Sequence, residues 1–567
     1  MDIRWNIQKS DPILVKKLSE ELGVNEIVAH LLVLRGINTY DEAKKFFRPQ
    51  ISDLHDPFLM KGMNEAVDRI QSALKNDEKI LIYGDYDVDG TTSVAMMYDF
   101  LNRFTKNVGY YIPDRYEEGY GISFKGIDYA QHEEFSLIIA LDCGIRAVKQ
   151  VEYASNKDID FIICDHHTPG LNIPRAISVL NPKQSDCKYP YKELSGCGVG
   201  FKLIQAICKR KKIDFNEIGE YLDLLAVSIG ADIVEVTGEN RVLAFYGMRV
   251  INQSPRAGLK ALIERSGKAG KLSIRDVIFG IAPRINAAGR IEHGKKAVEI
   301  LIEEDIEKAK ILADAIETHN QERKELDQNI TKEALLMIDE KKKSTVVYSS
   351  DWHKGVVGIV ASRLIEKHYK PTIVLSENDQ ELTGSARSVK GFDLYEALLK
   401  CEHLLEKFGG HKYAAGLTIK KQNLDSFISE FEKVVSSSIT EEQQIAEIEV
   451  DLEIDINEIT PKLYRIIKQF APFGPKNRIP NFVSRNVTDS GKGKRVGEEK
   501  SHLRLVLNTS TKPITSIGFR MGEELIKTEN NQEFDICYSV DENTWSGRTS
   551  MQLRLKGIKQ SVKVSPK

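Results

Sequence analysis

A short apolar stretch that ends in alternating aspartates constrains this chain more than any other feature. Residues 80–83 have the composition of a strand buried on both faces, as in a parallel sheet. Asp85, Asp87 and Asp89 follow it directly. Because the carboxyl ends of the strands form the ligand crevice of an open α/β sheet, we expect these carboxylates to converge there. Carboxylates so close repel one another unless cations lie between them.

Two other interpretations fit this segment alone. The aspartate spacing before Gly90 also opens the calcium loop of an EF-hand, but that loop needs a glutamate where this chain has Met96, and a helix before the first aspartate. A solvated acidic turn without any ligand is the second alternative. Recurrence of matching groups elsewhere in the chain distinguishes a metal site from both.

Matching groups recur three times, each after an apolar stretch that we expect to be a strand. Residues 137–141 precede Asp142, residues 161–164 precede Asp165, His166 and His167, and residues 224–231 precede Asp232. Carboxylate oxygens with one or two imidazoles suit Mn²⁺ or Mg²⁺ better than Zn²⁺. The sequence therefore predicts that four strand ends present Asp and His side chains to a divalent cation site.

The segments GDYDVDG, LDCG, CDHH and GADIVEV resemble, in order and spacing, the four motifs of the DHH phosphoesterase superfamily, and specifically of its RecJ-type single-strand exonucleases. The resemblance implies two divalent cations, Mn²⁺ or Mg²⁺, as cofactors. The metal ligands that it implies are Asp87, Asp89, Asp142, His166 and Asp232. Asp85, Asp165 and His167 would be catalytic neighbours. We expect His167 to orient groups or relay protons and Asp165 to fix the histidine tautomer.

Length and composition indicate a soluble multidomain protein. With 567 residues the chain is too long for one core and predicts about three or four domains. It has no run of 18 apolar residues and no apolar signal segment at its start, so we expect a cytoplasmic protein without membrane contact. The seven cysteines form no CxxC pair, which favours reduced core residues and argues against zinc held by cysteine.

Net charge gives no support to nucleic-acid binding. Lys and Arg total 80 against 83 Asp and Glu, a net charge of −3. Any surface that binds phosphates must therefore be local.

The fold class that we predict is α/β, in five segments. Residues 1–60 form an N-terminal lead-in, whose Phe46, Phe47 and Leu54 would pack on the catalytic domain by the resemblance. Residues 61–238 alternate strand and helix as a doubly wound parallel-sheet DHH catalytic domain. Residues 239–343 are a helical connector with a long helix or two within 302–341. A second, smaller α/β DHH-associated substrate-binding domain follows at 344–436, and an OB-type β-barrel at 445–560.

Several motifs imply substrate-binding residues through the same resemblance. The YIPDR string at 111–115 places Arg115 on a DNA phosphate. The PRINAAGR string at 283–290, too rich in small residues for an ordinary helix, would bring Arg284 or Arg290 to the scissile strand. In the second domain, glycines before a helix leave N–H groups free for an anion. The substrate-binding residues expected there are His353, Ser385, Arg387, Gly409, Gly410 and His411.

The C-terminal segment alternates short strands with polar loops. We expect strands at 448–452, 502–507, 514–519, 534–540 and 551–555, which suggests a barrel of OB type. An inert β-domain is the alternative. The lysines and arginines expected to give this barrel a positive binding face are Lys492, Lys494, Arg495, Lys500 and Arg504.

These observations predict a two-metal, single-strand-specific DNA exonuclease that releases 5′-mononucleotides in the 5′→3′ direction during DNA repair and recombination. The polarity and the preference for DNA come from the resemblance. Alternatives are a DHH-family nanoRNase or cyclic-dinucleotide phosphodiesterase, and a non-catalytic single-strand DNA-binding scaffold. Single-stranded DNA is the expected partner, with a helicase and a single-strand-binding protein as further candidates, and we expect a monomer.

Overall fold

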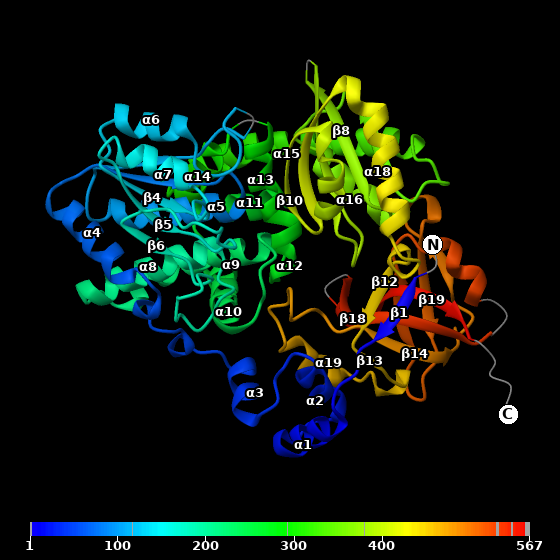
Figure 1. Cartoon of the computed structure of the whole chain (residues 1–567). Helices are drawn as coiled ribbons and strands as arrows, with labels where there is room; N and C mark the ends of the chain where they lie inside the picture. Colours follow the sequence, from blue (N-terminus) through cyan, green and yellow to red (C-terminus); the bar gives the residue numbers. More distant parts are fainter. Residues whose placement is uncertain are drawn as a thin grey trace. The chain divides into compact units, whose positions relative to one another are not determined.

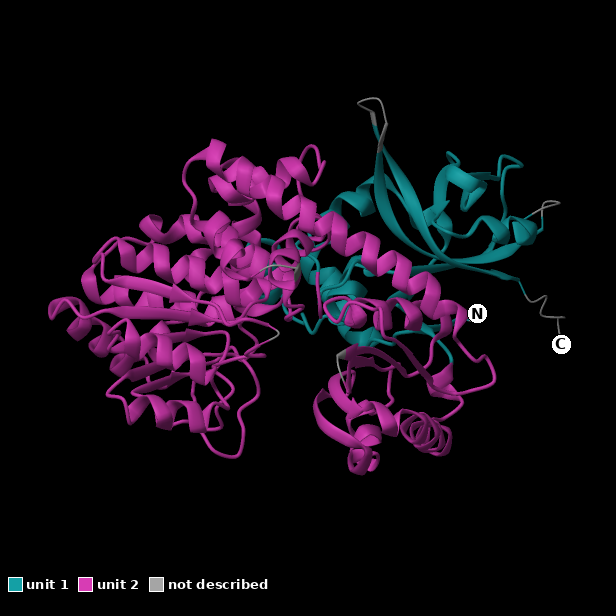
Figure 2. Ribbon diagram, turned by 90° about the horizontal axis from the view of Figure 1, so that it is seen from above, with its two compact units in different colours: residues 1–49, 445–473, 477–567 teal, residues 50–444, 474–476 magenta. Residues whose placement is uncertain are grey.

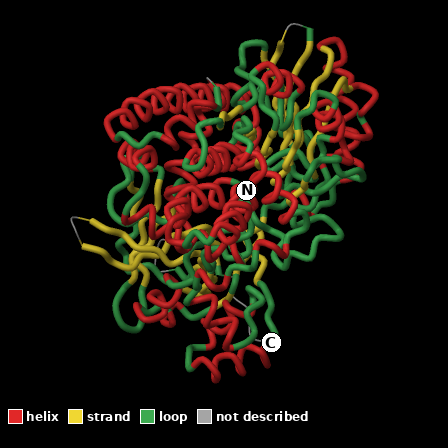
Figure 3. Tube along the Cα trace, turned by 90° about the vertical axis from the view of Figure 1, so that its left-hand side faces the viewer, coloured by secondary structure: helices red, strands yellow, loops and turns green. Residues whose placement is uncertain are grey.

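The computed structural model describes residues 3–115, 117–291, 293–378, 380–528, 532–545 and 548–561. They form two compact units, coloured separately in Figure 2: unit 1 lies within residues 1–49, 445–473 and 477–567, and unit 2 within 50–444 and 474–476. Figure 3 shows how helices and strands are distributed along the chain. No helix in the described ranges combines the length and the apolar composition needed to cross a bilayer.

Unit 2 begins with a five-stranded parallel sheet of order β3-β2-β4-β5-β6. Its strands are β2 (Ile80–Gly84), β3 (Val108–Tyr111), β4 (Leu137–Leu141), β5 (Asp160–Cys164) and β6 (Ser178–Leu180). The strand order reverses between β2 and β4, which is the point where doubly wound sheets bind their ligands. The predicted doubly wound sheet is confirmed.

Helices cover both faces of this sheet (Figure 1). Ile80 and Ile82 of β2 enter a core shared with α4 (Met63–Lys75), α5 (Val88–Asn102) and α8 (Gly196–Lys211). Leu81 and Tyr83 enter the opposite core, shared with α6 (Phe124–His132) and α7 (Val148–Ser155). Burial on both faces explains why these strands are apolar at every position.

The fourth apolar stretch is a helix, which corrects the prediction of a strand. Residues 224–231 belong to α9 (Leu222–Ala231), whose residues from Leu222 to Gly230 are all buried. A helix surrounded by protein is apolar on every side, so periodicity cannot distinguish it from a buried strand. Asp232 therefore follows the C-terminus of a helix.

Residues 239–343 are helical, as predicted. The helices are α10 (Gly238–Gln253), α11 (Ala257–Arg265), α12 (Ile274–Asp276), a π-helical turn (Val277–Ile281), α13 (Ala282–Ile291), α14 (Lys295–Ile302) and α15 (Ile306–Leu336). The expectation that PRINAAGR is not an ordinary helix was wrong, since it forms α13. Its small residues permit close packing: a Cβ at Gly289 would lie 2.9 Å from the carbonyl oxygen of Tyr86.

A second sheet of order β10-β11-β9-β8-β7 follows in unit 2. Its strands are β7 (Thr345–Ser349), β8 (Thr372–Asn378), β9 (Glu381–Arg387), β10 (Leu405–His411) and β11 (Ala414–Lys420). Only β7 and β8 are parallel among these pairs of described strands. The accompanying helices are α16 (Val357–His368), α17 (Leu394–Lys400) and α18 (Leu424–Ser438).

Unit 1 contains a seven-stranded sheet of order β13-β14-β18-β19-β17-β16-β15. Its strands are β13 (Leu452–Glu453), β14 (Phe482–Val487), β15 (Lys494–Val496), β16 (His502–Leu507), β17 (Ile514–Gly518), β18 (Phe534–Trp545) and β19 (Arg548–Gln560). The predicted strands lie in this sheet, with one exception. Residues 448–450 belong to β12 (Glu447–Val450), which pairs with β1 (Arg4–Ile7) in a separate two-stranded sheet. The sequence analysis missed β14, which pairs with the central β18.

The N-terminal helices belong to unit 1. They are α1 (Pro12–Leu22), α2 (Glu26–Val33) and α3 (Tyr40–Phe47), and α19 (Pro461–Lys468) completes the helices of this unit. The rings of Phe46 and Phe47 each lie 5.3 Å from that of Phe470, in edge-to-face contact. Their predicted packing on the catalytic domain is therefore corrected. Leu54 does pack against the core of the first sheet of unit 2.

Candidate metal centre

The first aspartates lie between the end of β2 and the first turn of α5. Asp85 is fully buried, and Asp87 caps α5 by accepting a hydrogen bond from the Gly90 N–H at 3.0 Å. The chain can turn this tightly only with glycine at position 90, because a Cβ there would lie 2.3 Å from the carbonyl oxygen of Asp85. The strand-loop-helix connection therefore fixes the first two carboxylates through the backbone.

Asp89 is held by donors that the sequence analysis missed. Its carboxylate accepts hydrogen bonds from the N–H groups of Gly196 and Cys197 at 2.7 and 2.8 Å, in the first turn of α8. The hydroxyl of Ser228 on α9 donates to it at 2.7 Å. The sequence signal for this cradle was Ser195-Gly-Cys-Gly, a capping serine before small residues at a helix start. A helix N-terminus favours the ionised carboxylate.

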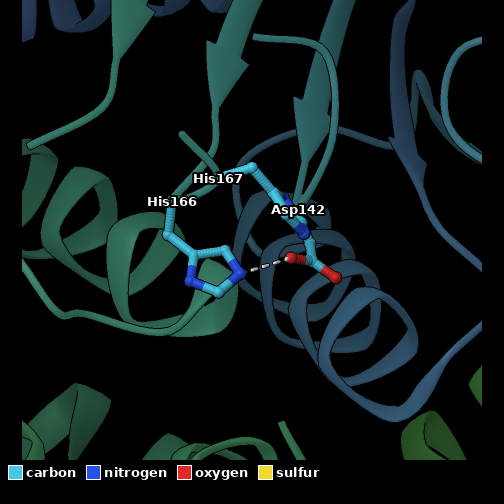
Figure 4. A group of neighbouring side chains, drawn as sticks. All are labelled: Asp142, His166 and His167. Atoms are coloured by element: carbon cyan, nitrogen blue, oxygen red, sulfur yellow. Dashed lines mark ion pairs between the residues drawn. The ribbon is translucent and has the colours of Figure 1, made fainter. Parts of the chain in front are cut away.

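His166 lies between carboxylates from three parts of the fold (Figure 4 shows its contact with Asp142). Its Nε2 is 3.3 Å from Asp142 Oδ1, 3.4 Å from Asp232 Oδ2 and 3.9 Å from Asp89 Oδ2. The structure thus brings together four of the five predicted metal ligands around one imidazole. The fifth, Asp87, lies next to them as the cap of α5.

His167 and Asp165 form a hydrogen-bonded pair. Asp165 Oδ1 lies 2.7 Å from His167 Nδ1, and the carboxylate also accepts N–H groups of Ile145, His166 and His167. These bonds outweigh burial and hold the pKa of Asp165 at about 2. Burial alone would lower the pKa of His167, but the bond to Asp165 raises it overall. With Nδ1 engaged, only Nε2 of His167 can face another group, and the Tyr120 hydroxyl lies 3.1 Å from it.

Burial and mutual repulsion disfavour the charged forms of Asp85, Asp142 and Asp232. Burial is the larger cause, and the charge of Asp87 the next, of a pKa of Asp85 well above its usual value. For Asp142, burial and then the charge of Asp89 raise the pKa in the same way. Burial and then Asp89 also raise the pKa of Asp232, to about 9. Cations placed among these groups would reverse this preference.

Several buried polar atoms at this point have no hydrogen-bond partner within the described part of the chain. They are Asp85 Oδ2, Asp142 Oδ1, Asp232 Oδ2, and both ring nitrogens of His166. Buried polar atoms normally have hydrogen-bond partners, so a cluster of atoms without them indicates a ligand site. Oxygen and imidazole donors of this kind fit Mn²⁺ or Mg²⁺.

Two overlapping donor groups could each hold an ion. One contains Asp142, His166 and His167, and the other Asp89, His166 and Asp232, with the donor atoms of each group within 4.8 Å of one another. His167 was predicted as a proton relay, whereas this geometry also makes its Nε2 a candidate ligand. Asp165 then orients His167, as carboxylates commonly do for ligating histidines.

Arg115 lies beside the metal centre. Its guanidinium stacks over the ring of Tyr86, 4.6 Å from the centroid. Burial raises the pKa of Asp85, and the charge of Arg115 opposes this with a smaller lowering effect. The neighbouring acids have other partners: Glu117 pairs with Lys125 at 2.9 Å, and Glu118 accepts from Tyr111 at 3.0 Å. Since these two acids are engaged elsewhere, the charge of Arg115 suits the predicted contact with a phosphate.

Arg387 and Ser385 lie together at the end of β9, against the start of α16. The Arg387 guanidinium donates to the Ser385 hydroxyl at 2.7 Å, and a Cβ at Gly358 would lie 3.1 Å from that guanidinium. Burial lowers the pKa of Arg387. No carboxylate is paired with it in the residues that the structure describes. A half-buried guanidinium and a hydroxyl at a helix N-terminus form a suitable anion site.

Arg284 is held by contacts within the protein, and its contact with DNA stays a prediction. Its guanidinium pairs with Glu317 at 2.5 Å and donates to the carbonyl oxygens of Gly280 and Arg265 at 2.5 and 3.0 Å. These contacts engage all three of its nitrogens. Arg290 donates to the carbonyl oxygen of Gly355, at 2.8 Å, in the loop before α16.

The remaining predicted residues lie in the second sheet and its loops. His353 Nδ1 accepts the Gly355 N–H at 3.1 Å, and burial, followed by the charge of Lys354, lowers the pKa of His353. Gly409, Gly410 and His411 form the exposed end of β10 rather than a tight turn. A side chain at Gly410 would meet the carbonyl oxygen of Ala414 at 2.3 Å, so glycine is required there by the β10-β11 hairpin.

Comparison with known proteins gives the same assignment along the chain. The DHH family, N-terminal domain, matches residues 79–229, the DHHA1 domain matches 341–437, and the RecJ OB domain matches 450–557. The single-stranded-DNA-specific exonuclease RecJ of Bacillus subtilis (strain 168) is 38% identical over 561 residues, covering 98% of this chain and 70% of that protein. The RecJ of Escherichia coli (strain K12) is 31% identical over 525 residues, covering 88% and 90%. The chain belongs to the RecJ family of single-stranded-DNA-specific exonucleases.

Solved structures of RecJ proteins share this fold and contain metal ions. RecJ of Thermus thermophilus in complex with Mn²⁺ matches with a TM-score of 0.84 at 26% identity, covering 100% of this chain and 81% of that one. The same protein in complex with Mg²⁺ matches with a TM-score of 0.79, covering 99% and 79%. The prediction of a RecJ-type chain with DHH, DHHA1 and OB domains is confirmed, and the donor groups described above could hold the ions that these relatives bind.

Gly196 supplies a first test of the metal centre. A Cβ at Gly196 would lie 2.5 Å from Asp142 Oδ1, so Gly196→Ala should displace a candidate ligand and weaken Mn²⁺ binding by at least about tenfold in isothermal titration calorimetry. Gly198→Ala is the matched control in the same helical turn, because its Cβ would have only ordinary contacts, at 3.4 Å from Leu194. Equal Mn²⁺ affinity of both variants would contradict the assignment of Asp142 to the metal centre.

Proposed function

We propose that this chain is a metal-dependent exonuclease that degrades single-stranded DNA in the 5′→3′ direction and releases 5′-mononucleotides. The observation that carries the proposal is the cluster of buried oxygen and nitrogen atoms without hydrogen bonds at the switch point of the parallel sheet. The relatives named as single-stranded-DNA-specific exonucleases support the substrate. Repair and recombination are the processes that we propose for it.

The residues of the centre have distinct roles in this proposal. Asp87, Asp89, Asp142, His166 and Asp232 hold two divalent cations, with His167 close enough to share in ligation. When bound, such ions polarise a scissile phosphate and lower the pKa of the attacking water. Asp165 keeps the proton of His167 on Nδ1, so that Nε2 presents a lone pair to the centre. Burial, and after it the charge of Asp87, raises the pKa of Asp85. Asp85 is therefore placed to accept a proton close to Arg115.

Two arginines and a serine form the proposed pocket for the 5′-terminal phosphate. Arg115, Ser385 and Arg387 supply guanidinium and hydroxyl donors, and a terminal phosphate carries more negative charge than an internal diester. We propose Arg290, His353, Gly409, Gly410 and His411 as further contacts of the DNA strand. Single-nucleotide release would follow from a fixed distance between this pocket and the cations.

The sheet of unit 1 is the proposed surface for longer single strands. Lys494 of β15 is paired in register with Arg504 of β16. The same row of the sheet continues through Ile517 of β17 to Arg554 of β19. Phe519, directly after β17, is 50% exposed and stacks under Arg554 at 5.0 Å. Positive charge beside an exposed ring is the combination that OB domains use to bind single strands.

The location, the partners and the domain limits also remain proposals. Seven free and buried cysteines support a reducing compartment such as the cytoplasm. A helicase that supplies single strands and a single-strand-binding protein are the proposed partners of a monomeric enzyme. We propose domains at 61–238, 344–436 and 445–560, which the matched ranges support.

The activity is tested with end-labelled oligonucleotides. In Mn²⁺ or Mg²⁺, the chain should shorten single-stranded DNA from its 5′ end to mononucleotides and leave duplex DNA intact. Asp142→Ala should lower turnover by at least about a thousandfold, because Asp142 contacts His166 within the centre. Asp160→Ala is a control, since Asp160 pairs with Arg69 elsewhere on the sheet. Preferential hydrolysis of dinucleotides, or Asp142→Ala turnover within tenfold of the wild type, would contradict the proposal.

Arg387 tests the recognition of the 5′ end. Arg387→Ala should weaken binding of a 5′-phosphorylated strand by about 1–3 kcal/mol, the scale of a lost charged hydrogen bond, and leave a 5′-hydroxyl strand nearly unaffected. Fluorescence anisotropy with both strands measures the difference. An equal loss on both strands would show that Arg387 serves an internal diester or the fold.

Phe519 tests the surface of unit 1. Phe519→Ala should weaken binding of a strand of about 30 nucleotides by about 1–3 kcal/mol, the range measured for stacking of one base on an aromatic ring. A strand of about five nucleotides should bind equally well. Tyr40→Ala is the matched control, since Tyr40 on α3 is also exposed, at 52%. Similar affinity of both variants for the long strand would exclude Phe519 from DNA binding.

A further inference from the structure

Ile233 has a backbone conformation that its side chain disfavours. It follows Asp232, the residue that caps α9, and its φ is +59°. A helix commonly ends with a residue in this left-handed region, but that residue is usually glycine or asparagine. Among non-glycine residues with positive φ in the described part of the chain, Ile233 alone is branched at Cβ. Such branching makes the left-handed region a true outlier.

Burial does not compensate for this strain. Ile233 is 73% exposed, so its side chain gains little from removal of apolar surface from water. Glycine would end α9 without strain, and a polar residue would suit the exposed position. Residues with strained backbone cluster at active sites and at ligand contacts.

The position of Ile233 next to Asp232 places it at the edge of the metal centre. The adjacent residue, Asp232, places its Oδ2 3.4 Å from His166 Nε2 and belongs to a metal-donor group. Ile233 therefore borders the centre where the scissile nucleotide would lie. An aliphatic side chain offers no hydrogen bond, so it can pack on the face of any base without sequence preference.

We propose that Ile233 is a substrate-positioning residue, whose exposed side chain packs against the nucleobase of the nucleotide at the metal centre. The inference rests on the proposed function, because it assumes a DNA strand at these ligands. It predicts that the left-handed backbone holds the side chain out toward the base. The stability of α9 would be higher without this side chain.

Ile233→Gly in the full chain separates the two effects. The variant should unfold at a slightly higher temperature, because the strain is relieved, yet lose about tenfold in kcat/KM on single-stranded DNA, mainly through KM. Ile233→Leu keeps the apolar surface and should retain kcat/KM within about threefold. Lys212→Gly is the matched control, since Lys212 caps α8 with φ +59° and is exposed, about 24 Å along the helix from the cradle of Asp89. It should gain stability without loss of activity.

A strand whose 5′-terminal nucleotide lacks its base identifies the contact. On this strand the wild type and Ile233→Gly should have the same kcat/KM, and both proteins should bind Mn²⁺ equally in calorimetry. An equal fold-loss on the abasic strand, or weaker Mn²⁺ binding by the variant, would show that the substitution acts through Asp232 and would overturn the inference. An unchanged KM on ordinary DNA would overturn it too. Failure of the wild type to degrade DNA would instead refute the proposed function.

Discussion

Repulsion between carboxylates at one edge of the parallel sheet is the constraint on which the rest of the structure depends. Burial, followed by the charge of Asp87, raises the pKa of Asp85, and burial followed by Asp89 raises the pKa of Asp142. The fold opposes this with fixed donors: α8 presents two N–H groups to Asp89, and the backbone presents three to Asp165. Oxygens without such donors are the ones left for cations.

One short helix connects this centre with the second sheet. α13 packs against the first aspartate loop so closely that a Cβ at Gly289 would lie 2.9 Å from the Tyr86 carbonyl oxygen. The next residue, Arg290, donates to the carbonyl oxygen of Gly355, just before α16. Since α16 begins beside Ser385 and Arg387, the same helix contacts both the metal-side loop and the loop of the anion site. These two contacts explain the glycine at position 289 and the arginine at position 290.

The sequence sufficed to predict most of the parallel sheet and the group of residues around His166, because each strand end carries its own acidic or imidazole motif. It failed where one pattern permits two structures. Residues 224–231 are mostly apolar, as either a buried strand or a buried helix would be, and only the tertiary contacts of α9 decide between them. Asp232 still lies beside His166, as the order of the motifs predicts, because its motif does not depend on the element before it.

The groups that hold Asp89 were not predicted from the sequence. Ser228 and the N–H groups of Gly196 and Cys197 hold Asp89, although they lie more than a hundred residues away in sequence. A single sequence shows no pairing across such distances, so the supports of a ligand are harder to find than the ligand itself. The lack of side-chain chemistry at Gly196 also conceals its role, which is to leave room for Asp142.

Asp142 and Ile233 are non-glycine residues with left-handed backbone at this centre, and their conformations have different explanations. Asp142 has φ +59°, and its N–H still bonds to Cys164 of β5 at 2.8 Å, so the chain turns sharply only after the strand pairing ends. Aspartate tolerates this region, and the turn brings its carboxylate 3.3 Å from His166, so contacts within the protein account for the conformation. Ile233 has the same φ without a compensating contact from burial. The proposed contact with a nucleobase would account for a conformation that burial does not.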